Sequence, residues 1–118
     1  MSDQLNSFMS PVKKEVVDQI ESLDLSTLQK LHLKLLSHCL EVFKDISLKA
    51  NNKFPNEILL KTWCENEAKK LRDESFSVLL MEQMNAAANK LKNYAKKERK
   101  QALDLNLDDL ITLISSET

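Results

Sequence analysis

The sequence predicts an all-α protein, a helical bundle of four to five helices with a long central helix and no β-sheet. First, the 118 residues include no glycine, and tight β-hairpin turns usually need one. Second, the apolar residues recur at spacings of three and four, which place them on one face of a helix. Third, residues suited to cap helices stand where these apolar series begin. We therefore expect a single all-helical domain over residues 1–118.

The first helix is expected over residues 10–23, after a loose N-terminus at residues 1–9. Ser10 can cap this helix, and Pro11 suits its first position because no helical hydrogen bond is required of that amide. The apolar side chains of the segment share one face: Val16, Val17, Ile20 and Leu23. The pattern therefore indicates an amphipathic helix.

The second helix is predicted over residues 26–50. Ser26 and Gln29 have the spacing of a capping box, in which each side chain binds the other residue's backbone amide. The apolar positions that follow form a wide face, typical of a core helix: Leu28, Leu31, Leu35, Leu36, Cys39, Val42, Phe43 and Ile46. Asn51, Asn52 and Pro55 give the clearest loop signal in the chain.

The third region, residues 55–102, is either one long helix or two helices. An unbroken helix would be about 70 Å long at about 1.5 Å per residue. Two apolar series run along it, one through Leu60, Cys64, Ala68 and Leu71, and one through Phe76, Leu80, Met84, Ala87, Leu91 and Tyr94. Continuing the first series leads to Ser75 and Leu79, one residue out of step with the second. A bend near Asp73–Ser75 would correct this, and both alternatives stay open.

A last helix is predicted over residues 106–115. Asn106 is placed to cap it, and Asp109 lies in its first turn, where a carboxylate suits the positive end of the helix dipole. Leu105 and Leu110 have the spacing of a hydrophobic staple. This segment is apolar enough that we expect it to pack on the bundle.

The composition excludes several classes of enzyme. Phosphate-binding loops, dinucleotide-binding fingerprints and the nucleophile elbow of hydrolases all need glycine. His32, His38 and Cys39 lack the spacing of metal ligands, and Cys39 lies on an apolar face, where a thiol packs as a small hydrophobe. We therefore predict that the chain is not an enzyme and has no catalytic residue, cofactor or metal site.

The expected compartment is the cytoplasm. Two cysteines are too few for a disulfide framework, and the first thirty residues lack the apolar block of a signal peptide. No apolar run approaches the about 18 residues that a membrane span needs. We expect no contact with a membrane.

The strongest local signal is a basic ridge near residues 90–100. It consists of Lys90, Lys92, Lys96, Lys97, Arg99 and Lys100, with Glu98 as the one acidic residue among them. Such a ridge could follow a phosphate backbone with an affinity that falls steeply with salt. It could equally bind an acidic protein, or be a solvated face that the acidic residues of 104–118 neutralise.

The leading functional prediction is a non-enzymatic helical protein–protein interaction module: an adaptor, a regulatory subunit or an inhibitor, with no small-molecule substrate. A 70 Å helix is too long for a compact bundle of this size, so it bends back or a second copy packs along it. We expect a homodimer that also binds another protein. Its candidate interface residues are Trp63, Leu110, Ile111 and Ile114. The alternative is a nucleic-acid-associated regulator that binds phosphate backbone through the basic ridge.

Overall fold

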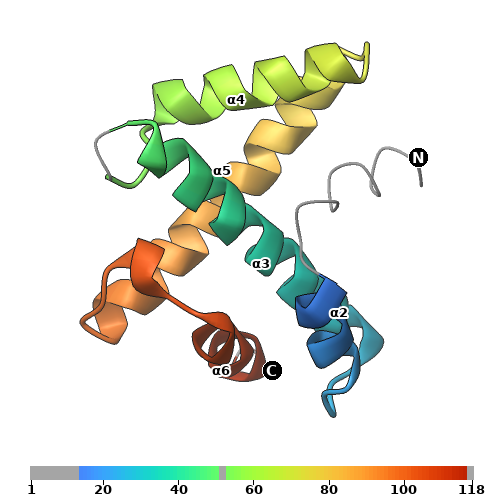
Figure 1. Cartoon of the computed structure of the whole chain (residues 1–118), viewed down its shortest axis with the longest axis vertical. Helices are drawn as coiled ribbons and strands as arrows, with labels where there is room; N and C mark the ends of the chain where they lie inside the picture. The colour runs from blue at the N-terminus through green and yellow to red at the C-terminus, as the bar shows by residue number, and fades with distance from the viewer. Residues whose placement is uncertain (1–13, 51–52, 117–118) are drawn as a thin grey trace.

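The computed structural model describes residues 14–50 and 53–116, and this part of the chain is all-helical, as predicted. Five α-helices and one short 3₁₀ turn follow one another, and no strand occurs among these residues (Figure 1). The elements are α2 (Lys14–Glu21), α3 (Thr27–Leu48), α4 (Glu57–Lys70), α5 (Ser75–Lys97), η1 (Ala102–Asp104) and α6 (Leu107–Ser116). The predicted loose segment 1–9 and the helix start at Ser10 and Pro11 lie outside the described residues.

Two of the predicted helix caps are present. At α3, Gln29 N donates to Ser26 Oγ at 3.1 Å, and Ser26 N donates to Gln29 Oε1 at 3.0 Å, which completes the capping box. Before α6, Asp109 N donates to Asn106 Oδ1 and Asn106 N donates to Asp109 Oδ2, both at 3.0 Å. Each pair satisfies amides that have no partner inside the helix. These local bonds fix where the two helices begin.

The region 55–102 contains two helices, so the unbroken 70 Å helix is not formed. α4 ends in a Schellman motif: Asp73 N donates to Ala68 O and Arg72 N donates to Lys69 O, both at 3.1 Å. Arg72 takes a left-handed conformation with φ 56°. Asp73 then accepts a hydrogen bond from Ser75 N at 3.2 Å, where α5 begins. The break lies where the two apolar series go out of step.

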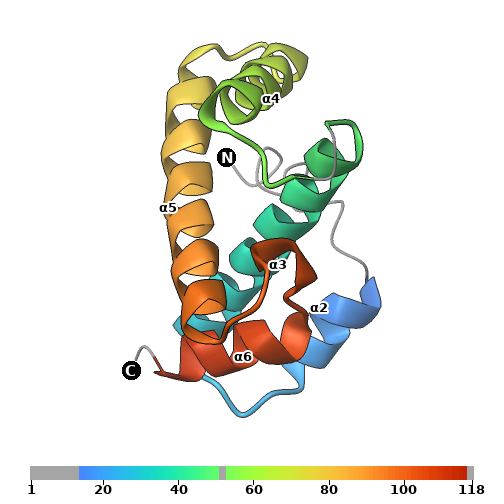
Figure 2. The same cartoon turned by 90° about the vertical axis from the view of Figure 1, so that its left-hand side faces the viewer.

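The helices form two groups that cross. α4 packs along the first part of α5, while α2 and α6 pack on α3, and η1 contacts both long helices. Figure 1 shows α3 and α5 crossing near the centre of the molecule, with α4 spanning one side of the crossing and α6 the opposite side. Figure 2 shows the same arrangement from the side. The molecule measures 37 × 33 × 24 Å, because the helical region 55–102 folds back on itself.

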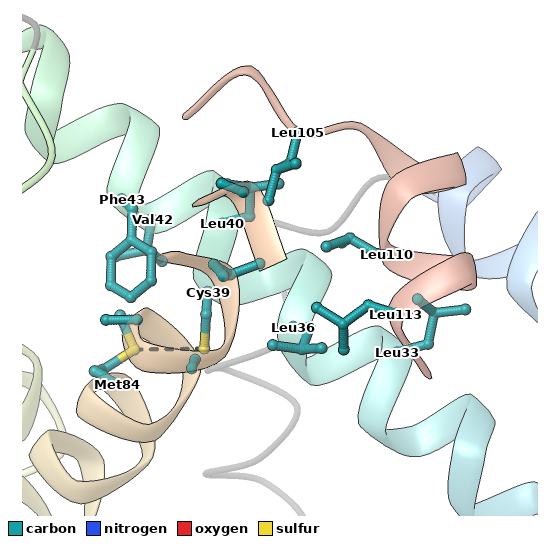
Figure 3. Close-up of a cluster of buried hydrophobic side chains, with 14 of the residues drawn as sticks. Leu33, Leu36, Cys39, Leu40, Val42, Phe43, Met84, Leu105, Leu110 and Leu113 are labelled. Carbon is teal, nitrogen blue, oxygen red and sulfur yellow. Dashed lines mark hydrogen bonds between the residues drawn. The ribbon is translucent and has the colours of Figure 1, made fainter. Parts of the chain in front are cut away.

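The core lies where α3 meets α5 and α6. Figure 3 shows Leu33, Leu36 and Leu40 of α3 beside Leu105, Leu110 and Leu113 of the C-terminal segment. On the side toward α5, the Cys39 thiol donates to Met84 Sδ at 3.5 Å (Figure 3). All the residues labelled in that view are buried. The core therefore has two parts, one between α3 and α5 and one between α3 and the C-terminal segment.

The predicted apolar face of α3 is partly wrong. Leu28 and Leu31 remain 61% and 42% exposed, whereas Leu33 and Leu40, which lie outside the predicted series, are buried. The reason is that α3 is covered from two directions: its predicted series matches the side toward α5, and Leu33 and Leu40 turn toward the C-terminal segment (Figure 3). The first turns of α3 thus keep large apolar side chains at the surface.

Candidate functional site

An apolar groove lies between α3 and α5, the two long helices that cross near the centre of the molecule. It has a volume of about 380 Å³. The α3 wall is formed by His32, Leu35, Leu36 and Cys39. The α5 wall is formed by Phe76, Leu79, Leu80, Gln83, Ala86, Ala87 and Lys90. Among the described residues that line this groove there is no carboxylate, and Lys90 is the one lysine or arginine.

The walls of the groove keep large apolar side chains within reach of a partner. Leu79 is 51% exposed, and Leu35 and Phe76 are half-buried. The exposed Leu31 lies four residues before Leu35, and Leu28 lies three residues before Leu31, so these leucines extend the apolar surface along α3. Contiguous apolar surface on a folded protein marks a site of interaction. The groove therefore has the character of a surface that binds another chain.

The floor of the groove offers no activated nucleophile. Burial raises the pKa of the Cys39 thiol to about 12, and that thiol already donates to Met84. Outside the groove, Cys64 on the buried face of α4 contacts Met81 Sδ at 3.9 Å, and burial raises the pKa of its thiol to about 11. A thiol needs a lowered pKa to react near neutral pH. In residues 14–50 and 53–116, no three His, Cys, Asp or Glu side chains come together as a metal site.

A second hollow continues the groove along α5. It has a volume of about 340 Å³ and shares Lys90 with the groove. Its lining comes from the second half of α5 and from α6: Lys90, Asn93, Tyr94, Lys97, Glu98, Thr112, Leu113 and Ser116. The surface along α5 therefore changes from apolar to polar and basic at Lys90.

The predicted basic ridge is divided by the structure. The Lys92 ammonium lies 4.5 Å from the ring centre of Phe54, and Lys100 Nζ donates to Asp109 Oδ1 at 2.7 Å. This ion pair raises the pKa of Lys100 and lowers the pKa of Asp109, with their hydrogen bond as the largest cause in both. Arg99 ends α5 in a left-handed conformation with φ 58°. The acidic tail therefore neutralises one of the basic side chains.

The remaining ridge residues lie on two sides of α5. Lys96 joins Lys92 and Lys100 around a hollow of about 360 Å³ beside Phe54. Lys90 and Lys97 line the hollow on the other side, next to the groove. The six residues therefore do not form one continuous face, and binding of nucleic acid by them stays a prediction.

Two of the four predicted interface residues are part of the core, and the other two lie at its edge. Leu110 and Ile114 are each 1% exposed, because α6 packs them against α3, so they offer no surface to a partner in this conformation. Ile111 and Trp63 are partly buried at the edge of the core. Sequence reasoning missed the groove. The sequence feature that could have indicated the groove is Leu79, a large apolar residue outside the buried series of α5.

The fold and the groove define a small all-helical protein whose most distinctive surface is suited to binding another protein. None of the helices described is long and apolar enough to cross a membrane. The chain belongs to the family described as NDH complex assembly factor CRR9, whose match covers residues 12–118 and so includes every helix described above. No curated protein and no solved structure matches the chain.

Proposed function

We propose that the chain is a non-catalytic assembly factor of an NDH complex, and that it binds a protein segment in the groove between α3 and α5. The observation that carries the proposal is membership of the CRR9 family over residues 12–118. An assembly factor acts by holding other proteins, so the proposal needs a docking surface and no reacting group. The groove supplies such a surface.

The groove suits an amphipathic helix. Its two walls are themselves helices, and helix-in-groove recognition uses apolar anchors of the partner between such walls. Covering the exposed half of Leu79 would contribute about 1 kcal/mol, since full burial of a leucine contributes about 1.5–3 kcal/mol. Leu28 and Leu31 would add similar amounts.

The proposal is tested by Leu79→Asp, with Val78→Asp as the matched control. Val78 is the preceding residue and is 64% exposed, but it does not line the groove. Both variants place the same charge on an exposed position of α5, so both are expected to fold. In cells that lack the chain, the amount of assembled NDH complex on a native gel should be restored by Val78→Asp and not by Leu79→Asp.

Full restoration by Leu79→Asp would contradict the groove as the functional surface. If the wild-type chain itself changes nothing in the amount of the complex, the assembly function is wrong. The thermal unfolding of both purified variants is recorded in parallel, so that a folding defect is recognised.

Three finer predictions concern dimerisation, nucleic-acid binding and location. The homodimer was expected because an unbroken 70 Å helix would need a second copy, and that helix is not formed. Dimerisation, nucleic-acid binding and a cytoplasmic location therefore stay predictions. Sedimentation of the purified chain measures the first of them directly.

A further inference from the structure

Apolar side chains lie on α3 between α2 and the groove. Glu21, at the end of α2, accepts a hydrogen bond from Lys30 Nζ at 2.8 Å and forms an ion pair with Lys34. These two lysines therefore mark the side of α3 that faces the end of α2. Successive residues of an α-helix are rotated by about 100°, so Leu31 and Leu35 lead from that side to the groove, whose wall includes Leu35. Leu31 is 42% exposed and Leu35 is half-buried, so apolar surface continues around α3 from α2 to the groove.

The chain that precedes α2 has a matching apolar pattern. Residues 1–13 lie outside the described part of the chain and lead directly into Lys14, where α2 begins. Leu5, Phe8 and Val12 follow one another at steps of three and four, the spacing of one apolar face of a helix. Only one acidic and one basic side chain occur in this segment. The segment therefore has the composition that an apolar groove between two helices accepts.

The segment is long enough to arrive at the groove. α2 has eight residues and is about 12 Å long, so its start lies close to the side of α3 that Glu21 contacts. An extended chain spans about 3.3 Å per residue, so the six residues between Lys14 and Phe8 cover about 20 Å. A helix such as α3 is about 10 Å across. Phe8 can therefore pass around α3 and enter the groove.

We propose that residues 1–13 occupy the groove in the free chain, with Phe8 beside Leu79, and that a client protein segment displaces them. The displacement step rests on the proposed function, whereas the occupancy by residues 1–13 does not. A short segment forms little helix alone in water, which agrees with the loose N-terminus that its local pattern predicts. The groove supplies the contacts that the local pattern lacks.

The covalent connection favours this occupant over a separate one. A linked segment faces its binding surface at an effective concentration in about the millimolar range. The same segment of a second copy has no such advantage and competes only at a comparable concentration of the chain. A client displaces the linked segment only if its own apolar anchors bind more tightly. The segment would therefore cover the groove until such a client is present.

Disulfide trapping in the full chain tests the occupancy. Met9→Cys with Leu79→Cys joins the segment to the groove, and Met9→Cys with Val78→Cys is the matched control, because Val78 is exposed but does not line the groove. Cys39 and Cys64 are buried and stay in both variants. A disulfide forms only when the Cα atoms come within about 7 Å. We expect the intramolecular disulfide to form at least about tenfold faster in the Leu79→Cys pair, because docking raises the local concentration of its thiols.

Two further variants, each placed in the Leu79→Cys pair, test the apolar face of the segment. Leu5→Asp with Phe8→Asp should slow the trapping to the rate of the Val78→Cys control. Asn6→Asp with Ser7→Asp adds the same charge outside the apolar face and should leave the rate unchanged. The disulfide is measured by mass spectrometry and on non-reducing gels.

Equal trapping rates at positions 78 and 79, or no trapping at position 79, would overturn the inference. So would a rate that does not respond to Leu5→Asp with Phe8→Asp. Disulfides that link two chains instead of closing one would overturn it in favour of a second copy as the occupant.

The displacement step has its own readout. In the restoration experiment, Leu5→Asp with Phe8→Asp leaves the groove free and should restore at least as much assembled complex as the parent chain. A failure like that expected of Leu79→Asp would overturn the displacement, because the segment would then be required for assembly. The trapping uses neither a client nor the complex, so the occupancy and the assembly function stand or fail separately.

Discussion

Replacing Arg72 by glycine should stabilise the chain. Arg72 follows the end of α4 with φ 56°, in the left-handed region where helices commonly place glycine. A residue with a Cβ atom loses about 1–2 kcal/mol in that conformation, and glycine does not. The two backbone hydrogen bonds of the Schellman motif, at 3.1 Å each, involve no side chain. Glycine therefore keeps the motif and removes its steric cost.

The net gain is smaller than the steric cost, because glycine also gives the unfolded chain more freedom. That freedom costs about 0.4–1 kcal/mol when the chain folds. The free energy of unfolding should therefore rise by about 0.5–1 kcal/mol, which raises the Tm of a chain of this size by about 2–4 °C. Arg99, with φ 58° at the end of α5, is expected to respond in the same way and additively.

Thermal unfolding followed by circular dichroism, with urea unfolding beside it, measures the change. Arg72→Ala removes the same side chain but keeps a Cβ atom, so it should give no comparable gain. Lys69→Gly lies inside α4 and should lower the free energy of unfolding by about 1 kcal/mol. If Arg72→Gly melts at or below the parent, or if Arg72→Ala gains as much, the explanation by backbone conformation is refuted.

Three further changes probe the core, a buried histidine and a cap. Leu91→Asp should cost several kcal/mol, because Leu91 is fully buried and the new carboxylate would lack a partner; a parent-like melting curve would contradict this core assignment. Burial lowers the pKa of His38 to about 4. The unfolded chain then binds its proton at a higher pH than the folded one, so about 2 kcal/mol of stability should be lost as the pH falls from about 6.5 to 4. His38→Leu should flatten that part of the curve of stability against pH, and an unchanged curve would show that other groups cause the loss. Asp109→Ala should cost about 1–2 kcal/mol in urea unfolding, because it removes the hydrogen bond from Asn106 N that completes the α6 cap and the ion pair with Lys100; the exposed Asp108→Ala is its control, and equal effects would argue against these two contacts.

The sequence was most informative where the chemistry is local. Ser26 and Asn106 begin helices because their side chains bind amides three residues away, and such bonds can be predicted from spacing alone. The break before Ser75 was one of two open alternatives, and the apolar face that goes out of step indicated where a break would lie. Both features depend on neighbours within a few residues.

The groove and the division of the ridge could not be predicted in this way. Leu31 and Leu33 have similar local patterns, and only the positions of α5 and α6 decide which one is buried. Lys92 meets Phe54 because the loop before α4 returns to the end of α5. Contacts between distant segments set the exposure of these residues. Such contacts cannot be predicted from the spacing of residues along the chain.

The two sulfur contacts place one thiol where α3 meets α5 and one where α4 meets α5. Cys39 meets Met84 where α3 crosses α5, and Cys64 meets Met81 where α4 lies on it. A buried thiol reacts with a labelling reagent only when its surroundings open. In chains that retain only one of these cysteines, the rate of thiol labelling would therefore measure how often the surroundings of that cysteine open. Faster labelling of Cys64 than of Cys39 would mean that α4 detaches while the α3–α5 crossing stays closed.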